Sequence, residues 1–214
     1  MAKKIFITAT NTNIGKTYTA KKVLSEFASR GFSIGVLKPV ETGVDELPSD
    51  ALELFSLAKT LNPKLNTLDL SDIVPFTFTE PMAPFVASRG EDLDLGIIKS
   101  AITKQEDLCD ILIIEGAGGV LVPINFDYTM LDLAREFCDA TLLVSHCNLG
   151  CINDAMLSKN ALQDLPHQLV FNPKNSSKES FLATSKPYFD AKGIETLFVD
   201  DDIAKICDIL YNSK

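Results

Sequence analysis

The sequence predicts an α/β fold, with a doubly wound, mostly parallel sheet that carries helices on both faces. Short apolar segments alternate with helical patterns along all 214 residues, as in strand–helix–strand units. Most of these apolar segments lack alternation with polar residues, which is typical of parallel strands buried on both faces. The expected strands are 4–8, 34–38, 110–115, 140–145, 168–171 and 195–198. The expected helices are 15–30, 50–60, 93–106, 130–137, 151–163, 178–189 and 202–211.

Length and composition predict one domain over residues 1–214, because 46% hydrophobic residues suffice for a sizeable core. No run of about 18 apolar residues occurs, so we expect no membrane partner and a cytoplasmic location. The net charge of −9, with no Lys/Arg cluster longer than two residues, argues against nucleic-acid binding. Five cysteines without a C-x-x-C spacing favour free thiols, and two isolated histidines do not indicate zinc.

Two local patterns refine the expected elements. Val23 and Phe27 lie at helical spacing in the first helix, and Gly31 follows as the residue that would end it. Residues 61–92 are rich in Pro and Thr and lack a clear periodicity. We expect this segment to form a lid or a surface excursion.

Residues 8–17, Thr-Ala-Thr-Asn-Thr-Asn-Ile-Gly-Lys-Thr, join the first strand to the first helix. Their last three residues match the phosphate-binding end of a P-loop, in which backbone N–H groups and a lysine face phosphates and a hydroxyl ligates Mg²⁺. The strict motif has glycine at position 10, where this chain has Thr10. We therefore expect ordinary backbone angles there, and a P-loop-like fold that binds a nucleoside triphosphate.

Ligands of parallel α/β sheets bind beyond the carboxyl ends of the strands, and two further polar clusters lie at such ends. Lys38 begins the cluster 38–43, where it either neutralises charge on a transferred phosphoryl group or is a solvated lysine in a turn. Glu115 ends an apolar strand and is followed by Gly-Ala-Gly-Gly. This arrangement is typical of a Walker B strand, whose acid binds Mg²⁺.

Two other clusters have simpler interpretations. Ser49-Asp50 is expected to form the N-cap of the helix 50–60, with Asp50 as a partner of the helix dipole. Residues 149–153, Leu-Gly-Cys-Ile-Asn, open a later helix. Their free N–H groups would suit a carboxylate, although composition alone favours an ordinary helix start.

Together and in this order, these clusters resemble the dethiobiotin synthetase family over nearly the whole chain. The family's G-T-D-T-x-V-G-K-T loop corresponds to residues 9–17, and its K-P-V-x-[ST]-G to residues 38–43. Its Ser-Asp-Ala, Glu-Gly-Ala-Gly-Gly and Leu-Gly-Cys-Ile-Asn-x-Ala patterns match residues 49–51, 115–119 and 149–155. The segment 75–84 is similar to the family's Y-x-F-x-x-P-x-x-P segment.

The resemblance implies a ligase of biotin biosynthesis that uses ATP and Mg²⁺. Its substrates would be 7,8-diaminononanoate and CO₂ or bicarbonate, and its products dethiobiotin, ADP and phosphate. The reaction would pass through a carbamate and a carbamic-phosphoric anhydride before the ureido ring closes. The family also implies a homodimer in which the substrate site is shared between subunits.

The resemblance further implies the roles of individual residues. Lys16 and Lys38 would be catalytic, and the metal ligands would be Thr17, Asp50 and Glu115. The ATP-binding residues would be Asn13, Ile14, Gly15, Lys16, Thr17, Tyr18, Asp50, Glu115, Gly116, Ala117, Gly118 and Asn172. The substrate-binding residues would be Thr12, Thr42, Gly118, Gly150, Cys151, Ile152 and Asn153.

Some positions depart from the family pattern. Ala9 and Asn11 replace a glycine and an aspartate of the loop, and Asn13 stands where an acid is common. In the base-reading region Asn172 is followed by proline instead of aspartate, and residues 199–202 replace a G-x-[IL]-P segment. We therefore expect weak discrimination between nucleotide bases, and a solvated loop at the three aspartates 200–202.

Two other P-loop classes compete with this interpretation. Amidating ligases of cobyrinate synthesis usually carry an additional glutaminase domain, for which 214 residues leave no room. Partition or septum-positioning switch ATPases generally have a second lysine near the start of the loop. Thr10 and Asn11 occupy that part of this chain, and no basic amphipathic tail follows.

Overall fold

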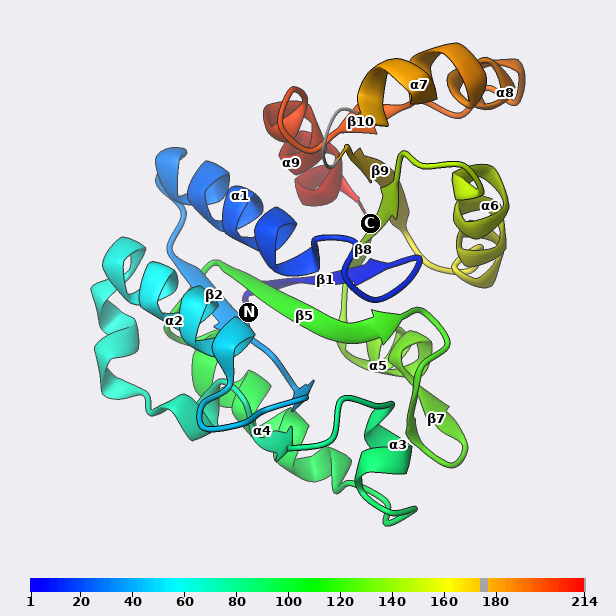
Figure 1. Ribbon diagram of the computed structural model, residues 1–214. Coiled ribbons are helices and arrows are strands. Elements are labelled where there is room, and N and C mark those ends of the chain that lie inside the picture. Colours follow the sequence, from blue (N-terminus) through cyan, green and yellow to red (C-terminus); the bar gives the residue numbers. More distant parts are fainter. Residues whose placement is uncertain (174–176, 214) are drawn as a thin grey trace.

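The computed structural model describes residues 1–173 and 177–213, and it confirms the predicted fold class (Figure 1). Six parallel strands form the central sheet in the order β10-β9-β8-β1-β5-β2. Their bounds are β1 Lys3–Ala9, β2 Ile34–Leu37, β5 Ile111–Gly119, β8 Ala140–His146, β9 His167–Asn172 and β10 Leu197–Phe198. Two small pairs join β3 (Val40–Thr42) to β4 (Phe76–Phe78) and β6 (Pro123–Asn125) to β7 (Tyr128–Thr129).

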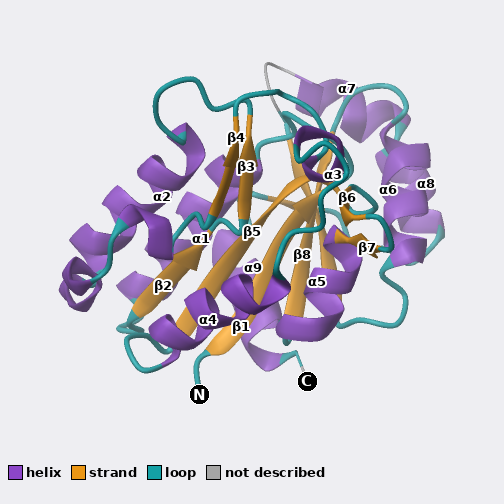
Figure 2. Cartoon of the chain, turned by 90° about the horizontal axis from the view of Figure 1, so that it is seen from below, coloured by secondary structure: helices purple, strands orange, loops and turns teal. Residues whose placement is uncertain are grey.

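Helices cover both faces of the sheet. They are α1 Lys16–Ser29, α2 Ser49–Leu61, α3 Pro84–Ala87, α4 Leu95–Glu106, α5 Met130–Phe137, α6 Cys151–Ala161, α7 Ser177–Thr184, α8 Lys186–Ala191 and α9 Ile203–Asn212. Helices α1, α2 and α9 pack on one face, and α4, α5 and α6 on the other. Figure 2 shows α4 and α5 in front of the strands. In the part of the chain that the structure describes, no helix combines the length and apolar character needed to cross a bilayer.

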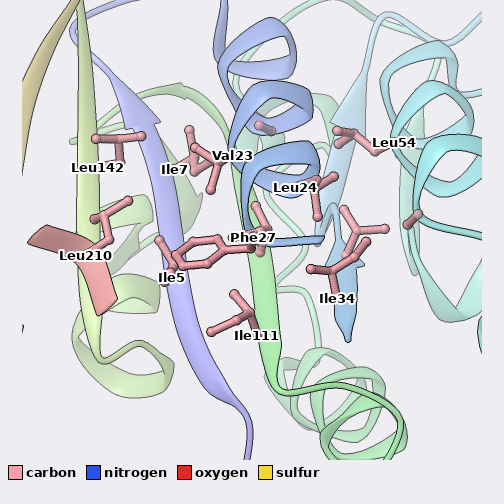
Figure 3. Close-up of a cluster of buried hydrophobic side chains, with 14 of the residues drawn as sticks. Ile5, Ile7, Val23, Leu24, Phe27, Ile34, Leu54, Ile111, Leu142 and Leu210 are labelled. Atoms are coloured by element: carbon pink, nitrogen blue, oxygen red, sulfur yellow. The ribbon is translucent and has the colours of Figure 1, made fainter. Parts of the chain in front are cut away.

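Successive side chains of the central strand β1 point to opposite faces of the sheet, so this one strand contributes to the hydrophobic cores on both faces. Ile5 and Ile7 of β1 point toward α1, while Phe6 points toward α4 and α5. Phe27 of α1 is fully buried over β1 and β5 (Figure 3). Gly31 follows α1 with φ +89°, and its N–H donates to the carbonyl of Ala28, as expected for a residue that ends a helix.

The edge strand β2 is closed by a side chain of α4. The Gln105 amide accepts from the N–H of Val36 at 3.0 Å and donates to the carbonyl of the same residue at 2.8 Å. The side chain therefore imitates a neighbouring strand, and it is fully buried. This contact protects the backbone of β2 from pairing with another chain, a liability of exposed sheet edges.

One expectation about secondary structure was wrong, and one segment contains elements that were not expected. The helix expected at 178–189 is divided into α7 and α8 at Ser185, because Pro187 lies in the first turn of α8 and disfavours helical continuation from the preceding turn. The segment 61–92, for which no element was expected, contains β4, α3 and the 3-10 turns Pro63–Thr67 and Leu70–Asp72. These pieces are too short for a periodic pattern to reveal them.

The carboxyl ends of β1, β5 and β2 lie side by side in the sheet, and this edge carries the loops that matter for function. The loop 10–15 follows β1, and Lys38 follows β2 directly. Strand β5 continues past Glu115 to Gly119, four residues beyond the expected end. Figure 2 shows β3 and β4 beyond this same end of the sheet.

Candidate functional site

The loop between β1 and α1 has the backbone geometry that its sequence suggests. Gly15 has φ +104° and Asn13 has φ +59°, both in the left-handed region. Glycine adopts this region without steric cost, and asparagine is among the residues that tolerate it. Neither Ala9 nor Thr10 has a positive φ, which confirms the expectation of ordinary backbone angles there. The glycine of the strict motif is therefore unnecessary at position 10.

A pocket of about 330 Å³ opens at the carboxyl ends of β1, β2 and β5. It brings together the loop, the residues that follow β2, the first turn of α2 and the end of β5. Its lining consists of Thr12, Asn13, Gly15, Lys16, Thr17, Lys38, Glu41, Thr42, Asp50, Glu115, Ala117 and Gly118. Four segments that are far apart in the sequence thus converge where the sheet topology predicts a ligand.

A buried ammonium group connects the acids of this pocket. Lys38 Nζ lies 2.5 Å from Glu115 Oε1 and 3.1 Å from Asp50 Oδ2. The side chains of Lys38 and Glu115 are 3% and 0% exposed, whereas that of Asp50 is 44% exposed. Lys38 is therefore not a solvated lysine in a turn. Its buried position favours the other interpretation, in which its ammonium group neutralises charge within the pocket.

The acids determine the charge state of Lys38. Burial alone lowers the pKa of its ammonium, but the attraction of Glu115 and then of Asp50 outweighs burial, so the pKa of Lys38 is raised above 10.5. The stabilisation that Lys38 gains on folding is therefore present below pH 10.5. It is lost as the pH rises through the higher pKa of the folded state. At neutral pH the pocket contains a fixed positive charge.

The donor set of the pocket fits a hard divalent cation. Glu115 Oε1 also accepts from the Thr17 hydroxyl at 3.0 Å, while Glu115 Oε2 is buried without a hydrogen-bond partner. An orphaned buried carboxylate oxygen is costly unless a ligand satisfies it. Within the described residues no group of three or more His, Cys, Asp or Glu side chains gathers to hold a metal. Carboxylate and hydroxyl oxygens supplemented by phosphate and water suit Mg²⁺.

The N-cap expected at Ser49-Asp50 was wrong. Helix α2 begins at Ser49, its N-cap residue is Pro48, and no side chain of that residue caps the helix. Instead Glu41 of β3 accepts the N–H of Asp50 at 3.0 Å and the N–H of Ala51 at 2.9 Å. Burial raises the pKa of Glu41, and the two backbone donors oppose only part of this shift.

Sequence reasoning missed Glu41, because Ser49-Asp50 offered an apparent local cap for the helix. Glu41 is an acid in the short strand Val40–Thr42, and it is buried. The helix that begins eight residues later has proline at its N-cap, which provides no side-chain acceptor. The cap therefore comes from a residue outside the helix, and no local sequence pattern marks it.

Gly116 and Gly118, which follow Glu115, are glycine for different structural reasons. A Cβ on Gly116 would lie 2.8 Å from the Phe6 ring, so this position is glycine because the ring packs there. Gly118 has φ +64° and lines the pocket together with Ala117, whereas Gly116 does not line it. Close approach of backbone to ligand is thus available at 117 and 118.

The expected base-reading residue Asn172 contacts the loop between β1 and α1. The Asn172 amide donates to the Ile14 carbonyl at 2.8 Å from a buried position at the end of β9. The three aspartates 200–202 lie in a turn in which Asp200 and Asp201 are exposed, in agreement with the expected solvated loop, but each of the three has a partner. Asp200 accepts from Tyr18 and pairs with Lys22, Asp201 pairs with Lys178, and Asp202 accepts the N–H of Phe198.

The start of α6 does not line this pocket in the single chain. Gly150 has φ +97° and begins the helix, Cys151 is buried, and Ile152 and Asn153 follow in the first turn. Leu149 is 99% exposed just before the helix. The expected substrate residues 150–153 are therefore absent from the lining of the pocket that contains Thr12 and Thr42.

The fold and the loop are those of P-loop nucleoside triphosphatases. A family model described as an AAA domain, AAA_26, matches residues 3–197. The chain is similar to the MinD cell division protein of Aquifex aeolicus, with a TM-score of 0.51 and 14% identity over 98% of this chain and 87% of that one. It is also similar to a plasmid partition protein of Borrelia burgdorferi, with a TM-score of 0.54 and 11% identity over 98% and 96%. At such identities the likeness concerns the fold alone.

Similarity in sequence is more specific. The chain is 40% identical over 189 residues to the ATP-dependent dethiobiotin synthetase BioD of Sulfurovum sp. (strain NBC37-1), which covers 87% of this chain and 90% of that protein. It is 34% identical over 215 residues to the BioD protein of Wolinella succinogenes, which covers 99% of both. The chain therefore belongs to the dethiobiotin synthetase family. Its relation to partition ATPases is structural only.

Removing one member of the buried pair should destabilise the protein. Lys38→Met leaves the Glu115 charge buried without a counter-charge, and we expect it to lower the free energy of unfolding by about 3 kcal/mol. Adding Glu115→Gln removes that charge and should restore most of the loss. Urea denaturation at pH 7 measures both effects.

The matched control is Lys104→Met, which removes an exposed lysine paired with Asp72 and should cost less than about 1 kcal/mol. A Lys38→Met variant as stable as this control, or a double variant without any recovery, would contradict the assignment of a buried ion pair.

Proposed function

We propose that this chain is an ATP-dependent dethiobiotin synthetase, which closes a ureido ring from 7,8-diaminononanoate and CO₂ and releases dethiobiotin, ADP and phosphate. Its family supports this activity. The observation that carries the proposal is the convergence of Lys16, Lys38 and the orphaned oxygen of Glu115 on one pocket at the end of a P-loop sheet. These groups are the ones that an anionic phosphoryl transfer requires.

Charge explains why two lysines are needed. The attacking carbamate and the γ-phosphate of ATP are both anions, so their approach is unfavourable unless positive charge surrounds them. Lys16 would hold the outer phosphates from the loop, and Lys38 would face the carbamate and the transferred phosphoryl group. Mg²⁺ held by Thr17, Asp50 and Glu115 would neutralise charge on the phosphate oxygens. The amine that remains free then attacks the mixed anhydride, and phosphate leaves as the ring closes.

The diamine would bind next to the phosphate pocket. A second cavity of about 400 Å³ shares Thr12, Thr42 and Gly118 with the first, so the two are continuous. Its lining also includes Pro81, Met82 and Ala83, which lie between β4 and α3, and Pro84 at the start of α3. Polar groups near the loop and apolar groups at residues 81–84 suit a molecule with two amines and an aliphatic chain. This supports a substrate role for Thr12 and Thr42.

A homodimer would complete the substrate site. The start of α6 does not line the pocket of its own chain, while its N–H groups suit a carboxylate. Leu149, Leu157 and Leu121 are exposed apolar side chains around this helix and the end of β5. A groove joins the loop residues 10–12 to Leu157 and Ser158 of α6. We infer that a second copy covers this groove and brings its own residues 150–153 toward the tail carboxylate of the diamine.

Product formation tests the proposed function. Purified protein incubated with ATP, Mg²⁺, bicarbonate and 7,8-diaminononanoate should form dethiobiotin, detected by mass spectrometry, and ATP hydrolysis should require both bicarbonate and the diamine. Lys38→Ala should lower turnover by about 10²-fold or more, the usual loss for an electrostatic stabiliser. Circular dichroism identifies a temperature at which this variant is folded, and turnover is measured at that temperature. Absence of the ureido product would overturn the function, and near-normal turnover of the variant would remove Lys38 from the mechanism.

Nucleotide selectivity should be weak. The Asn172 amide is occupied by the Ile14 carbonyl, Pro173 offers no N–H, and the aspartates 200–202 are engaged by neighbouring groups. Few groups therefore remain to distinguish one base from another. Turnover at saturating ATP, GTP and CTP, measured at equal Mg²⁺, should be comparable. Strict dependence on ATP would refute this expectation.

The dimer can be tested by mass. Sedimentation equilibrium should give about twice the chain mass of 23.4 kDa. Leu157→Asp places a charge in the apolar groove and should shift the protein toward the monomer and weaken diamine binding. The control Ile97→Asp, which alters an exposed residue of α4 outside this groove, should leave the mass unchanged. A monomeric wild-type protein with full activity would exclude a shared site.

A further inference from the structure

The carboxylate of Glu41 holds the backbone of a residue whose side chain enters the phosphate pocket. Its two oxygens accept the N–H groups of Asp50 and Ala51, at 3.0 and 2.9 Å. Asp50 itself extends its carboxylate to Lys38 Nζ at 3.1 Å. Asp50 is therefore held from two sides, by Glu41 through its backbone N–H and by Lys38 through its side chain.

Asp50 has little else to fix its position. Its side chain is 44% exposed, and the Lys38 contact is the one hydrogen bond that the structure gives for its carboxylate within the described residues. The first turn of α2 lacks a local cap, since Pro48 provides no side-chain acceptor. Because unpaired N–H groups at a helix start favour fraying, the first turn of α2 needs an acceptor from elsewhere.

Glu41 is well suited to provide that acceptor. It belongs to β3, which pairs with β4 in register Glu41 to Thr77, so its own backbone is held by a strand. Its side chain is buried, and a negative charge at a helix N-terminus is stabilised by the helix dipole. A carboxylate with both oxygens engaged cannot move without breaking two hydrogen bonds, so it defines where the helix begins.

We propose that Glu41 is a positioning residue that fixes Asp50, and through Asp50 the metal–nucleotide site, by capping the first turn of α2. This inference rests on the proposed function, because it takes Asp50 as a ligand of the Mg²⁺ that accompanies ATP. Glu41 touches neither the phosphates nor the diamine in this role. Groups that orient a metal ligand from behind commonly change metal affinity by 10- to 100-fold when replaced.

The alternative is that Glu41 binds the diamine directly. Glu41 is among the residues that line the pocket, and a carboxylate attracts an ammonium group. The two roles predict different defects. Loss of a positioning residue weakens Mg²⁺ and nucleotide binding and loosens the start of α2, whereas loss of a substrate contact raises the KM for the diamine alone.

The experiment compares Glu41→Gln with Glu53→Gln. Both replace a carboxylate by an isosteric amide, but Glu53 lies on the exposed side of α2, where it pairs with Lys21 and caps nothing. Mg²⁺ is titrated by calorimetry into protein saturated with adenylyl imidodiphosphate, so no turnover is needed. Amide hydrogen exchange at Asp50 and Ala51 is measured in parallel.

We expect Glu41→Gln to weaken Mg²⁺ binding by about 10-fold or more and to accelerate exchange at Asp50 and Ala51, because a glutamine amide can accept only through its single oxygen. Glu53→Gln should change Mg²⁺ affinity by less than about 2-fold. If Glu41→Gln does not fold, Glu41→Asp, whose shorter side chain cannot span both N–H groups, should show the same pattern.

Two results would overturn the inference. One is a Glu41→Gln protein that matches Glu53→Gln in both Mg²⁺ affinity and exchange. The other is a rise in the KM for the diamine with Mg²⁺ affinity unchanged, which would make Glu41 a substrate contact. Asp50→Asn separates these outcomes from failure of the proposed function. If it loses Mg²⁺ affinity while Glu41→Gln does not, only the positioning role fails, whereas a wild-type protein that forms no dethiobiotin removes the function itself.

Discussion

The site depends on one buried ammonium group shared between two carboxylates. Lys38 Nζ contacts Glu115 and Asp50, and the side chains of Lys38 and Glu115 are both buried. Burial of these charges is unfavourable, and their mutual attraction compensates only while all three side chains stay in place. The buried ion pair of Lys38 and Glu115 is therefore weak evidence for a contribution to stability, and it indicates a functional role instead. A fixed positive charge beside a phosphate-binding loop is what the transfer of a phosphoryl group to an anion requires.

The sheet brings these groups together because parallel strands end at one edge. The ends of β1, β2 and β5 supply the loop, Lys38 and Glu115, and the cap from Glu41 fixes the helix that carries Asp50. Packing constrains the same region, since Phe6 fills the space that a side chain at position 116 would need. The polar site and the apolar core are thus built from the same few strands, so changes in one are expected to affect the other.

Much of the fold could be predicted from the sequence, because continuous apolar strands and periodic helices leave a clear pattern. The convergence of Lys16, Lys38 and Glu115 followed from their places at strand ends. The cap of α2 could not be predicted in the same way, since Glu41 acts on residues nine and ten positions away through a contact that no local pattern encodes. The partners of Asp200 and Asp201 were likewise missed, because these lysine and tyrosine side chains lie on helices distant in sequence.

The most direct measurement is an NMR titration of the Lys38 ammonium in protein labelled at lysine. The attraction of Glu115 and Asp50 predicts a group that stays protonated beyond pH 10.5 in the wild type and that loses its proton at lower pH in Glu115→Gln. A Lys38 that titrates at or below 10.5 in the wild type, with no change in Glu115→Gln, would contradict the account, because the ammonium would then not be held by the acids of the pocket.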